Sequence, residues 1–124
     1  MVSNMASKFV WYDVTARKPG EVREFYAALF DWQIGSDANP GPYNGWIMDG
    51  EQPWAAVVEA ADSTAGRWLP YVQVENLDTA TRKAKALGAT VVQDKTDGPA
   101  GTAVTIADPG GALIALWVPF ASQS

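Results

Sequence analysis

Hydrophobic positions along the chain change their spacing at intervals and predict a strand, a helix and three further strands, twice over. The first copy opens with residues 8–15 (KFVWYDVT), which are rich in β-branched and aromatic residues and predict a strand. Pro19 then suits the first turn of a helix, where a missing backbone N–H costs little. The apolar residues that follow recur three and four positions apart and predict one face of a helix that ends at Asp31 and Trp32: Val22, Phe25, Tyr26, Leu29 and Phe30.

Short strands and turn-rich segments complete the first copy. Residues 32–34 predict the start of a second strand, and residues 35–45 (GSDANPGPYNG) predict a loop because Gly, Pro and Asn crowd that stretch. Residues 46–48 and 54–59 predict two short strands, and the DGEQP segment between them is typical of a hairpin. Residues 60–67 are polar and predict a linker.

The second copy repeats this order. Residues 68–74 predict a strand, and either Asn76 or Asp78 can cap the helix that follows. Gly88 occupies the place where helices commonly close in the left-handed conformation. The predicted apolar face of this helix consists of Leu77, Ala80, Ala84 and Leu87, and the predicted later strands are residues 89–93, 103–107 and 112–118, with DKTDGPAG and DPGG between them.

Two copies of one unit, offset by about 57 to 58 residues, predict a pseudo-symmetric α+β domain. We expect two βαβββ modules, at about 8–59 and 68–119, that form one concave mixed sheet with the helices on its outer face. The single domain would then cover residues 8–119. Residues 1–7 are expected to be a loose leader and residues 120–124 a tail.

Composition narrows the chemistry of this domain. The chain of 124 residues is 48% hydrophobic and 19% charged, which indicates one ordinary globular domain. It has no cysteine and no histidine, which excludes disulfides, thiolate nucleophiles and the commonest zinc ligand and general base. The net charge is −5 and the nine Lys and Arg are scattered, so we expect no nucleic-acid partner. No apolar run approaches the roughly 18 residues of a membrane span, so we expect no membrane partner and a cytoplasmic location.

Three stretches, in this order and spacing, resemble the vicinal oxygen chelate superfamily of glyoxalases, bleomycin-resistance proteins and extradiol dioxygenases. They are WYDVTARKPGEVREFYAALFDW, WLPYVQVENLDTATRKAKALGATVV and GTAVTIADPGGALIALWVP, and together they cover nearly the whole chain. Within that superfamily the chain looks similar to bacterial glyoxalase-like proteins that begin with a Trp-x-Glu strand. The resemblance implies that each module forms half of a cup, and that the protein is a homodimer.

The resemblance also implies where a metal site would lie. Metal-dependent members place His or Glu on the first strand, His on the strand that opens the second module, and Glu on the last strand. These positions fall on Trp11, Leu69 and Ala115, none of which can bind a metal ion. A fourth carboxylate position would fall near residues 57–59, where only Glu59 has a ligating side chain. We therefore expect neither a metal ion nor another cofactor.

Strand side chains alternate between faces, which predicts what lines the cup instead. If Trp11 faces the cup, so do Phe9 and Asp13, whereas Val10, Tyr12 and Val14 pack under the helix. The expected lining is aromatic with a few polar points, and Trp46, Met48 and Trp54 are expected at its wall or rim. The other expected lining residues are Leu69, Tyr71, Gln73, Leu113, Ala115 and Trp117.

Three functions remain open on the sequence alone. The first is metal-independent binding of a small aromatic or cationic molecule, because tryptophan rings stack on such ligands. The second is a metal-independent lyase or isomerase that uses Asp13 as its acid or base. The third is a metal lyase with oxygen ligands alone, such as Asp13 and Glu59. Against these stands a structural role for Asp13, hydrogen-bonded to loop backbone or paired with Arg17 or Lys18, and a role of the tryptophans in the core or a dimer interface.

Overall fold

The computed structural model describes residues 7–35 and 41–120, so most of the expected leader and tail lies outside the described residues. The first half of the chain forms β1 (Phe9–Ala16), α1 (Pro19–Phe30), β2 (Gln33–Gly35), β3 (Tyr43–Asp49) and β4 (Gln52–Glu59). The second half forms β5 (Arg67–Gln73), α2 (Leu77–Ala86), β6 (Thr90–Asp97), β7 (Gly101–Ala107) and β8 (Leu113–Pro119).

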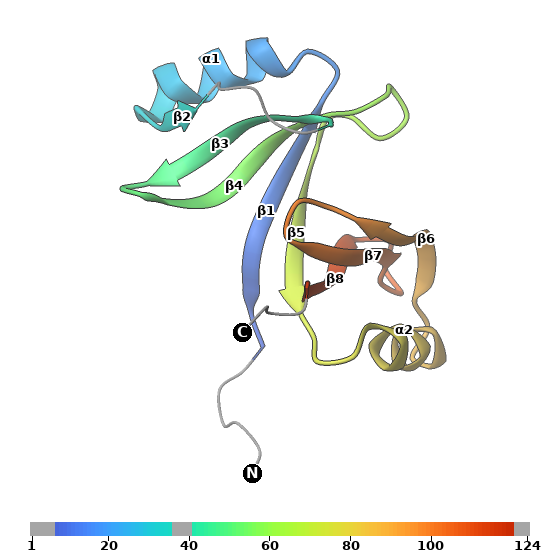
Figure 1. The fold of residues 1–124 in the computed structure, drawn as a ribbon. Coiled ribbons are helices and arrows are strands. Elements are labelled where there is room, and N and C mark those ends of the chain that lie inside the picture. Colours follow the sequence, from blue (N-terminus) through green and yellow to red (C-terminus); the bar gives the residue numbers. More distant parts are fainter. Residues whose placement is uncertain (1–6, 36–40, 121–124) are drawn as a thin grey trace. The chain divides into compact units, whose positions relative to one another are not determined.

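This α+β architecture confirms the predicted βαβββ modules (Figure 1). In the first module β1 pairs with β4 in parallel, and β4–β3 and β3–β2 are antiparallel. The second module repeats the order, with β5 parallel to β8 and antiparallel β8–β7 and β7–β6 pairs. By compactness the chain divides into a first unit, Trp11–Leu69, and a second unit that combines Met1–Val10 with Pro70–Ser124.

Helix α1 begins as the sequence predicts, with Pro19 in its first turn. It ends at Asp31, whose left-handed backbone (φ 59°) lets its N–H donate to the Ala27 carbonyl. Figure 1 shows α1 beside the β3–β4 hairpin. Only part of its predicted apolar face is buried, because Val22 packs into the core whereas Phe25 and Leu29 are more than half exposed. The core of the first unit consists of Val14, Ile47, Ala55 and Val57, packed against Tyr12, Val22, Trp32, Ile34 and Trp54.

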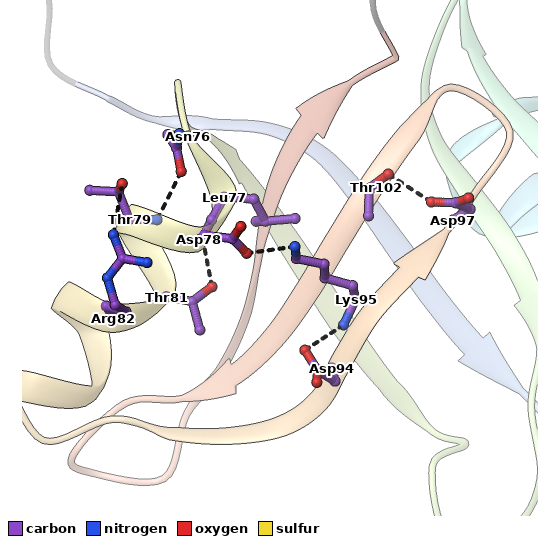
Figure 2. Close-up of polar contacts among 10 residues, drawn as sticks. All are labelled: Asn76, Leu77, Asp78, Thr79, Thr81, Arg82, Asp94, Lys95, Asp97 and Thr102. Carbon is purple, nitrogen blue, oxygen red and sulfur yellow. Dashed lines mark hydrogen bonds and ion pairs between the residues drawn. The ribbon is translucent and has the colours of Figure 1, made fainter.

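In the second unit Asn76 caps α2, since its side-chain oxygen accepts a hydrogen bond from the Thr79 N–H at 2.9 Å. Asp78, the other candidate cap, instead forms an ion pair with Lys95 of β6 at 2.6 Å (Figure 2). The predicted apolar face is wrong at Leu87, which lies beyond the end of α2 and is 70% exposed. The core here consists of Leu77, Val104, Ile106 and Leu116.

Two segments predicted as connections are strands in the structure. Residues 94–97 extend β6, where Asp97 pairs with Thr102 of β7. The Thr102 hydroxyl donates a hydrogen bond to the Asp97 Oδ1 at 2.7 Å (Figure 2). Residues 43–45 begin β3, where Tyr43 pairs with Val58 of β4. The polar and glycine-rich composition of both segments predicts loops. Pairing with a neighbouring strand instead determines their conformation, and local composition does not report that pairing. Within the described ranges, neither helix has the length and apolar character needed to cross a membrane.

Candidate functional site

The face of β1 that points away from the core carries a buried acid. Tyr12 and Val14 pack into the core on the α1 side, so alternation directs Trp11 and Asp13 to the opposite face, as predicted. Asp13 is only 4% exposed, and its Oδ1 accepts a hydrogen bond from the Trp11 indole Nε1 at 2.8 Å. Burying a carboxylate costs free energy unless it has such partners, and buried acids often mark functional sites. This face of β1 is therefore the candidate site.

The cationic partners that the sequence offered for Asp13 are engaged with other carboxylates. Arg17 forms an ion pair with Asp62 at 3.2 Å, and Lys18 forms one with Glu21 at 3.7 Å. Both pairs are largely solvent-exposed. Aromatic residues lie near Asp13, since Trp11 donates a hydrogen bond to it and its charge acts on Tyr43 of β3.

Trp46 and Tyr43 of β3 extend the aromatic surface beside Trp11. The Trp11 and Trp46 rings meet edge to face with centroids 6.0 Å apart, and Tyr43 stacks on Trp46 at 5.5 Å. Residues three apart on a regular strand point to opposite faces, yet Tyr43 and Trp46 are in contact. A register shift between their pairs with β4 explains this, because one extra residue turns both rings to one face. We call Trp11, Asp13, Tyr43 and Trp46 the Asp13 cluster.

The bulge that brings Tyr43 to the cluster is fastened to α1. The Arg23 guanidinium donates to the backbone carbonyl of Asn44 at 2.8 Å and also to the Asn44 side-chain oxygen. Gly45 is buried with φ 142°, and a Cβ atom there would lie 2.8 Å from the Arg23 side chain. Glycine is thus required at the bulge, and α1 indirectly positions the aromatic surface.

The surroundings of Tyr43 make its phenol harder to ionise. Burial, and secondly the negative charge of Asp13, raise the pKa of Tyr43 to about 12. The phenol is therefore protonated at neutral pH and can donate a hydrogen bond. Sequence reasoning missed Tyr43 because it lies in a stretch read as loop. The signal that could have found it is the aromatic pair Tyr43 and Trp46 around a glycine, at the edge of a predicted strand.

The residues present do not fit a metal ion. Trp11, Leu69 and Ala115 have no ligating atoms, and the neutral Tyr43 phenol is a poor substitute for a carboxylate. The β1–β4 register pairs Asp13 with Ala56 and Ala16 with Glu59. Glu59 is therefore three residues beyond Asp13, about 10 Å along the strands and on the other face, so the two carboxylates cannot bind one ion. Among the described residues no group of three potential ligands converges.

Trp54 does not lie at the wall where the sequence placed it. Ile47 pairs with Ala55 and Met48 with Pro53, so Trp54 is an extra residue in a second bulge. Its ring packs against Trp32 at 5.1 Å and Tyr12 at 6.0 Å, on the α1 side of the sheet. A bulge can re-aim a side chain in this way, and strict alternation cannot foresee it. Met48 and Leu69 are half-buried on β3 and β5.

The other expected lining residues belong to the second unit, where pairing places them side by side. Tyr71 pairs with Ala115 and Gln73 with Trp117 across the parallel β5–β8 pair. Leu113 lies two residues before Ala115 on the same strand and therefore on the same face. Trp117 also covers Gly101, where a Cβ atom would lie 2.6 Å from its indole nitrogen. Ala115 is fully buried, so its small size serves packing in this unit.

Comparisons with known proteins agree with this fold. A family model described as a glyoxalase-like domain matches residues 10–117. Comparison with curated proteins finds no match. Methylmalonyl-CoA epimerase from Mycobacterium tuberculosis has a similar structure, with a TM-score of 0.63, 16% identity, and coverage of 98% of this chain and 94% of that one.

Two further solved structures have the same fold. A glyoxalase/bleomycin resistance protein/dioxygenase superfamily member from Vibrio splendidus has a TM-score of 0.60 at 6% identity, covering 91% of this chain and 99% of that one. A glyoxalase I mutant from Zea mays has a TM-score of 0.64 at 16% identity, covering 95% of this chain and 45% of that one. At such identities the likeness concerns the fold alone.

Proposed function

The chain belongs to the glyoxalase-like domain family of the vicinal oxygen chelate superfamily, and from this premise we propose that it binds a small aromatic or cationic molecule without a metal ion. The observation that carries the proposal is the Asp13 carboxylate, buried among the rings of Trp11, Tyr43 and Trp46. This combination of one acid and several aromatic faces suits a flat or cationic ligand.

The chemistry of the cluster favours a positive charge on the ligand. Indole faces attract cations, and the attraction grows as water is excluded. A carboxylate in the same surroundings adds a direct Coulombic term that surface screening weakens little. Tyr43 stays protonated, so it adds no competing negative charge and can donate to a polar group of the ligand.

Metal independence is supported by the residue types at the positions where the superfamily carries metal ligands. Three positions at which the superfamily carries ligands hold Trp, Leu and Ala in this chain, and the chain contains no histidine or cysteine. Asp13 and Glu59 are too far apart and face opposite ways. Binding energy would then come from stacking, cation–π contact and the Asp13 charge.

Calorimetric titration with a matched pair of ligands tests this proposal. N-methylquinolinium is a flat cation, and 1-methylnaphthalene is its uncharged isostere. We expect wild-type protein to prefer the cation, and Asp13→Asn to weaken cation binding about tenfold while leaving the neutral ligand nearly unchanged. Asp49→Asn is the control, since it removes an exposed carboxylate from β3. Equal cation affinity in wild type and Asp13→Asn would refute the role of Asp13.

A second candidate function is metal-independent acid–base catalysis by Asp13. It is favoured by the burial of this one carboxylate in aromatic surroundings, where acids and bases are often tuned for proton transfer. On this proposal Asp13→Asn abolishes turnover of a substrate while a neutral ligand still binds. Turnover by Asp13→Asn at the wild-type rate would refute a catalytic role for Asp13.

We also propose that the protein is a homodimer. The support lies in the C-terminal half of α1, where Leu29 and Phe30 are 56% and 51% exposed in the single chain. Large apolar side chains grouped on one helix face are commonly covered by a partner, and a two-fold axis would cover both copies at once. Light scattering measures the mass directly.

A further inference from the structure

A groove of about 810 Å³ lies on the first unit where α1 begins. Its walls come from the end of β1, the N-terminal half of α1, the linker after β4 and the start of β5. Its volume falls within the range of roughly 300–1,000 Å³ that is typical of small-molecule sites. Val14 and Val22 line it, so it lies on the α1 side of the sheet, and no residue of the Asp13 cluster contributes to it.

One wall of the groove is aromatic and accessible. Phe25 is 57% exposed and Trp68 is 37% exposed, and both rings pack edge to face on Tyr26, at 5.0 and 5.6 Å. The Trp68 indole Nε1 donates to the Tyr26 hydroxyl oxygen at 3.2 Å. Because that oxygen accepts, the Tyr26 hydroxyl proton is available to a ligand. This wall therefore offers aromatic ring surface together with a hydroxyl group that can donate a hydrogen bond.

The residues that line the groove carry an excess of positive charge, although the protein as a whole is acidic. Three of the nine basic residues of the chain line the groove, Arg17, Lys18 and Arg67, against two acids, Glu21 and Asp62. The acids pair with Arg17 and Lys18, which leaves Arg67 as the excess charge. In the described part of the chain, the one hydrogen bond of the Arg67 guanidinium runs from Nη2 to the Ser63 carbonyl at 3.0 Å. Its remaining N–H donors suit a carboxylate, which a guanidinium binds through two parallel hydrogen bonds.

The groove is built on anchored backbone. The Thr15 hydroxyl donates to the Thr64 carbonyl at 2.7 Å and accepts from the Arg67 N–H at 3.3 Å. The Gly66 N–H donates to the Thr15 carbonyl at 2.7 Å. These contacts tie the linker and the start of β5 to the end of β1, so Arg67 and Trp68 are held in place before a ligand arrives.

We propose that this groove binds a small organic anion with a flat apolar body, of the aromatic carboxylate class. The body lies against Phe25, Tyr26 and Trp68, and the carboxylate meets the Arg67 guanidinium and the Tyr26 hydroxyl. This site takes a ligand of opposite charge to that expected at the Asp13 cluster. Each of the two proposed sites can therefore be tested, and refuted, independently of the other.

Calorimetric titration with 2-naphthoate tests the groove. We expect Arg67→Gln to weaken 2-naphthoate binding about tenfold, because a charge-assisted bidentate contact is lost. Tyr26→Phe should weaken it severalfold through the lost hydroxyl. Arg82→Gln is the matched control, since it removes an exposed guanidinium from α2, and it should bind like wild type. Asp13→Asn should also bind 2-naphthoate like wild type. Thermal unfolding confirms that each variant is folded.

The cation 2-naphthylmethylammonium separates charge recognition from simple apolar attachment. Measured in Asp13→Asn, which removes the charge of the proposed cation site, it should bind more weakly than 2-naphthoate, and adding Arg67→Gln should not weaken it further. The proposal is overturned if wild type and Arg67→Gln bind 2-naphthoate equally, or if wild type shows no binding at millimolar concentration. It is equally overturned if Asp13→Asn reduces 2-naphthoate affinity as much as Arg67→Gln does. A change from dimer to monomer in Arg67→Gln would show that the groove is an interface instead.

Discussion

Asp13 is unusual among the charged residues of the first unit, because its carboxylate is almost completely removed from water. The Trp11 indole N–H donates a hydrogen bond to this carboxylate at 2.8 Å. The same charge acts on Tyr43 and makes its phenolate harder to form. The phenol of Tyr43 is thus harder to ionise than that of an exposed tyrosine.

The pH dependence of Tyr43 follows from this arrangement. Its folded pKa of about 12 lies above the ordinary value of 10, so the unfolded chain releases this proton first as pH rises. Tyr43 should therefore contribute stability that is fully present below pH 10 and is lost as pH rises toward 12. Titration of phenolate absorbance should show one late tyrosine in wild type, absent from Tyr43→Phe.

The two causes of that shift can be separated by a second variant. Asp13→Asn removes the charge and keeps the burial, and burial is the larger cause. The pKa of Tyr43 in Asp13→Asn should accordingly fall, and remain above 10. An unchanged pKa in this variant would mean that the Asp13 charge does not reach the phenol.

At the scale of elements, the bulge in β3 decides what the cluster contains. Without it, Tyr43 and Trp46 would point to opposite faces. The bulge depends on Gly45, whose φ of 142° is unfavourable for other residues, and on Arg23, which holds the Asn44 peptide from α1. Helix α1 therefore supports the cluster through one arginine, besides covering the core of the first unit.

Gly45→Ala should destabilise the protein by about 2–4 kcal/mol, because it adds strain at positive φ and a clash with the Arg23 side chain. Gly50→Ala is the matched control, since Gly50 also has positive φ (62°) but open space around it. It should cost about 1 kcal/mol, from strain alone. Chemical denaturation measures both. A cost at Gly45 no greater than at Gly50 would contradict the account of the bulge.

The sequence predicted elements well where periodicity controls them. The alternation of Tyr12 and Val14 with Trp11 and Asp13 correctly assigned both faces of β1. Of the two residues proposed as alternative caps of α2, Asn76 is the cap and Asp78 is not. The prediction of side-chain faces from alternation failed where a bulge interrupts the two-residue repeat of a strand. The bulges at Gly45 and Trp54 added Tyr43 to the Asp13 side and moved Trp54 to the core side. Both depend on pairing with a distant strand, which local pattern does not contain.

At the scale of the whole molecule, the two units share one topology and differ in their helices. Helix α1 exposes Phe25, Leu29 and Phe30, whereas α2 presents charged side chains such as Arg82 and Lys83. Sequence periodicity predicted buried apolar faces for both helices, since it cannot tell a face covered by the same chain from one left for a partner. The exposed Leu29 and Phe30 in the C-terminal half of α1 are the physical reason to expect association, whereas Phe25 lines the groove.

The homodimer can be tested through this difference between the helices. Light scattering should give wild type a mass of about twice the 13.3 kDa of one chain. Leu29→Glu places a charge in the centre of the exposed face and should give a single-chain mass, because burying an unpaired carboxylate in an interface costs several kcal/mol. Ala86→Glu adds the same charge at an exposed position of α2 and should leave the dimer intact. A wild-type mass of one chain at every concentration would refute the dimer. If Leu29→Glu remains a dimer, the dimer interface does not include this face of α1.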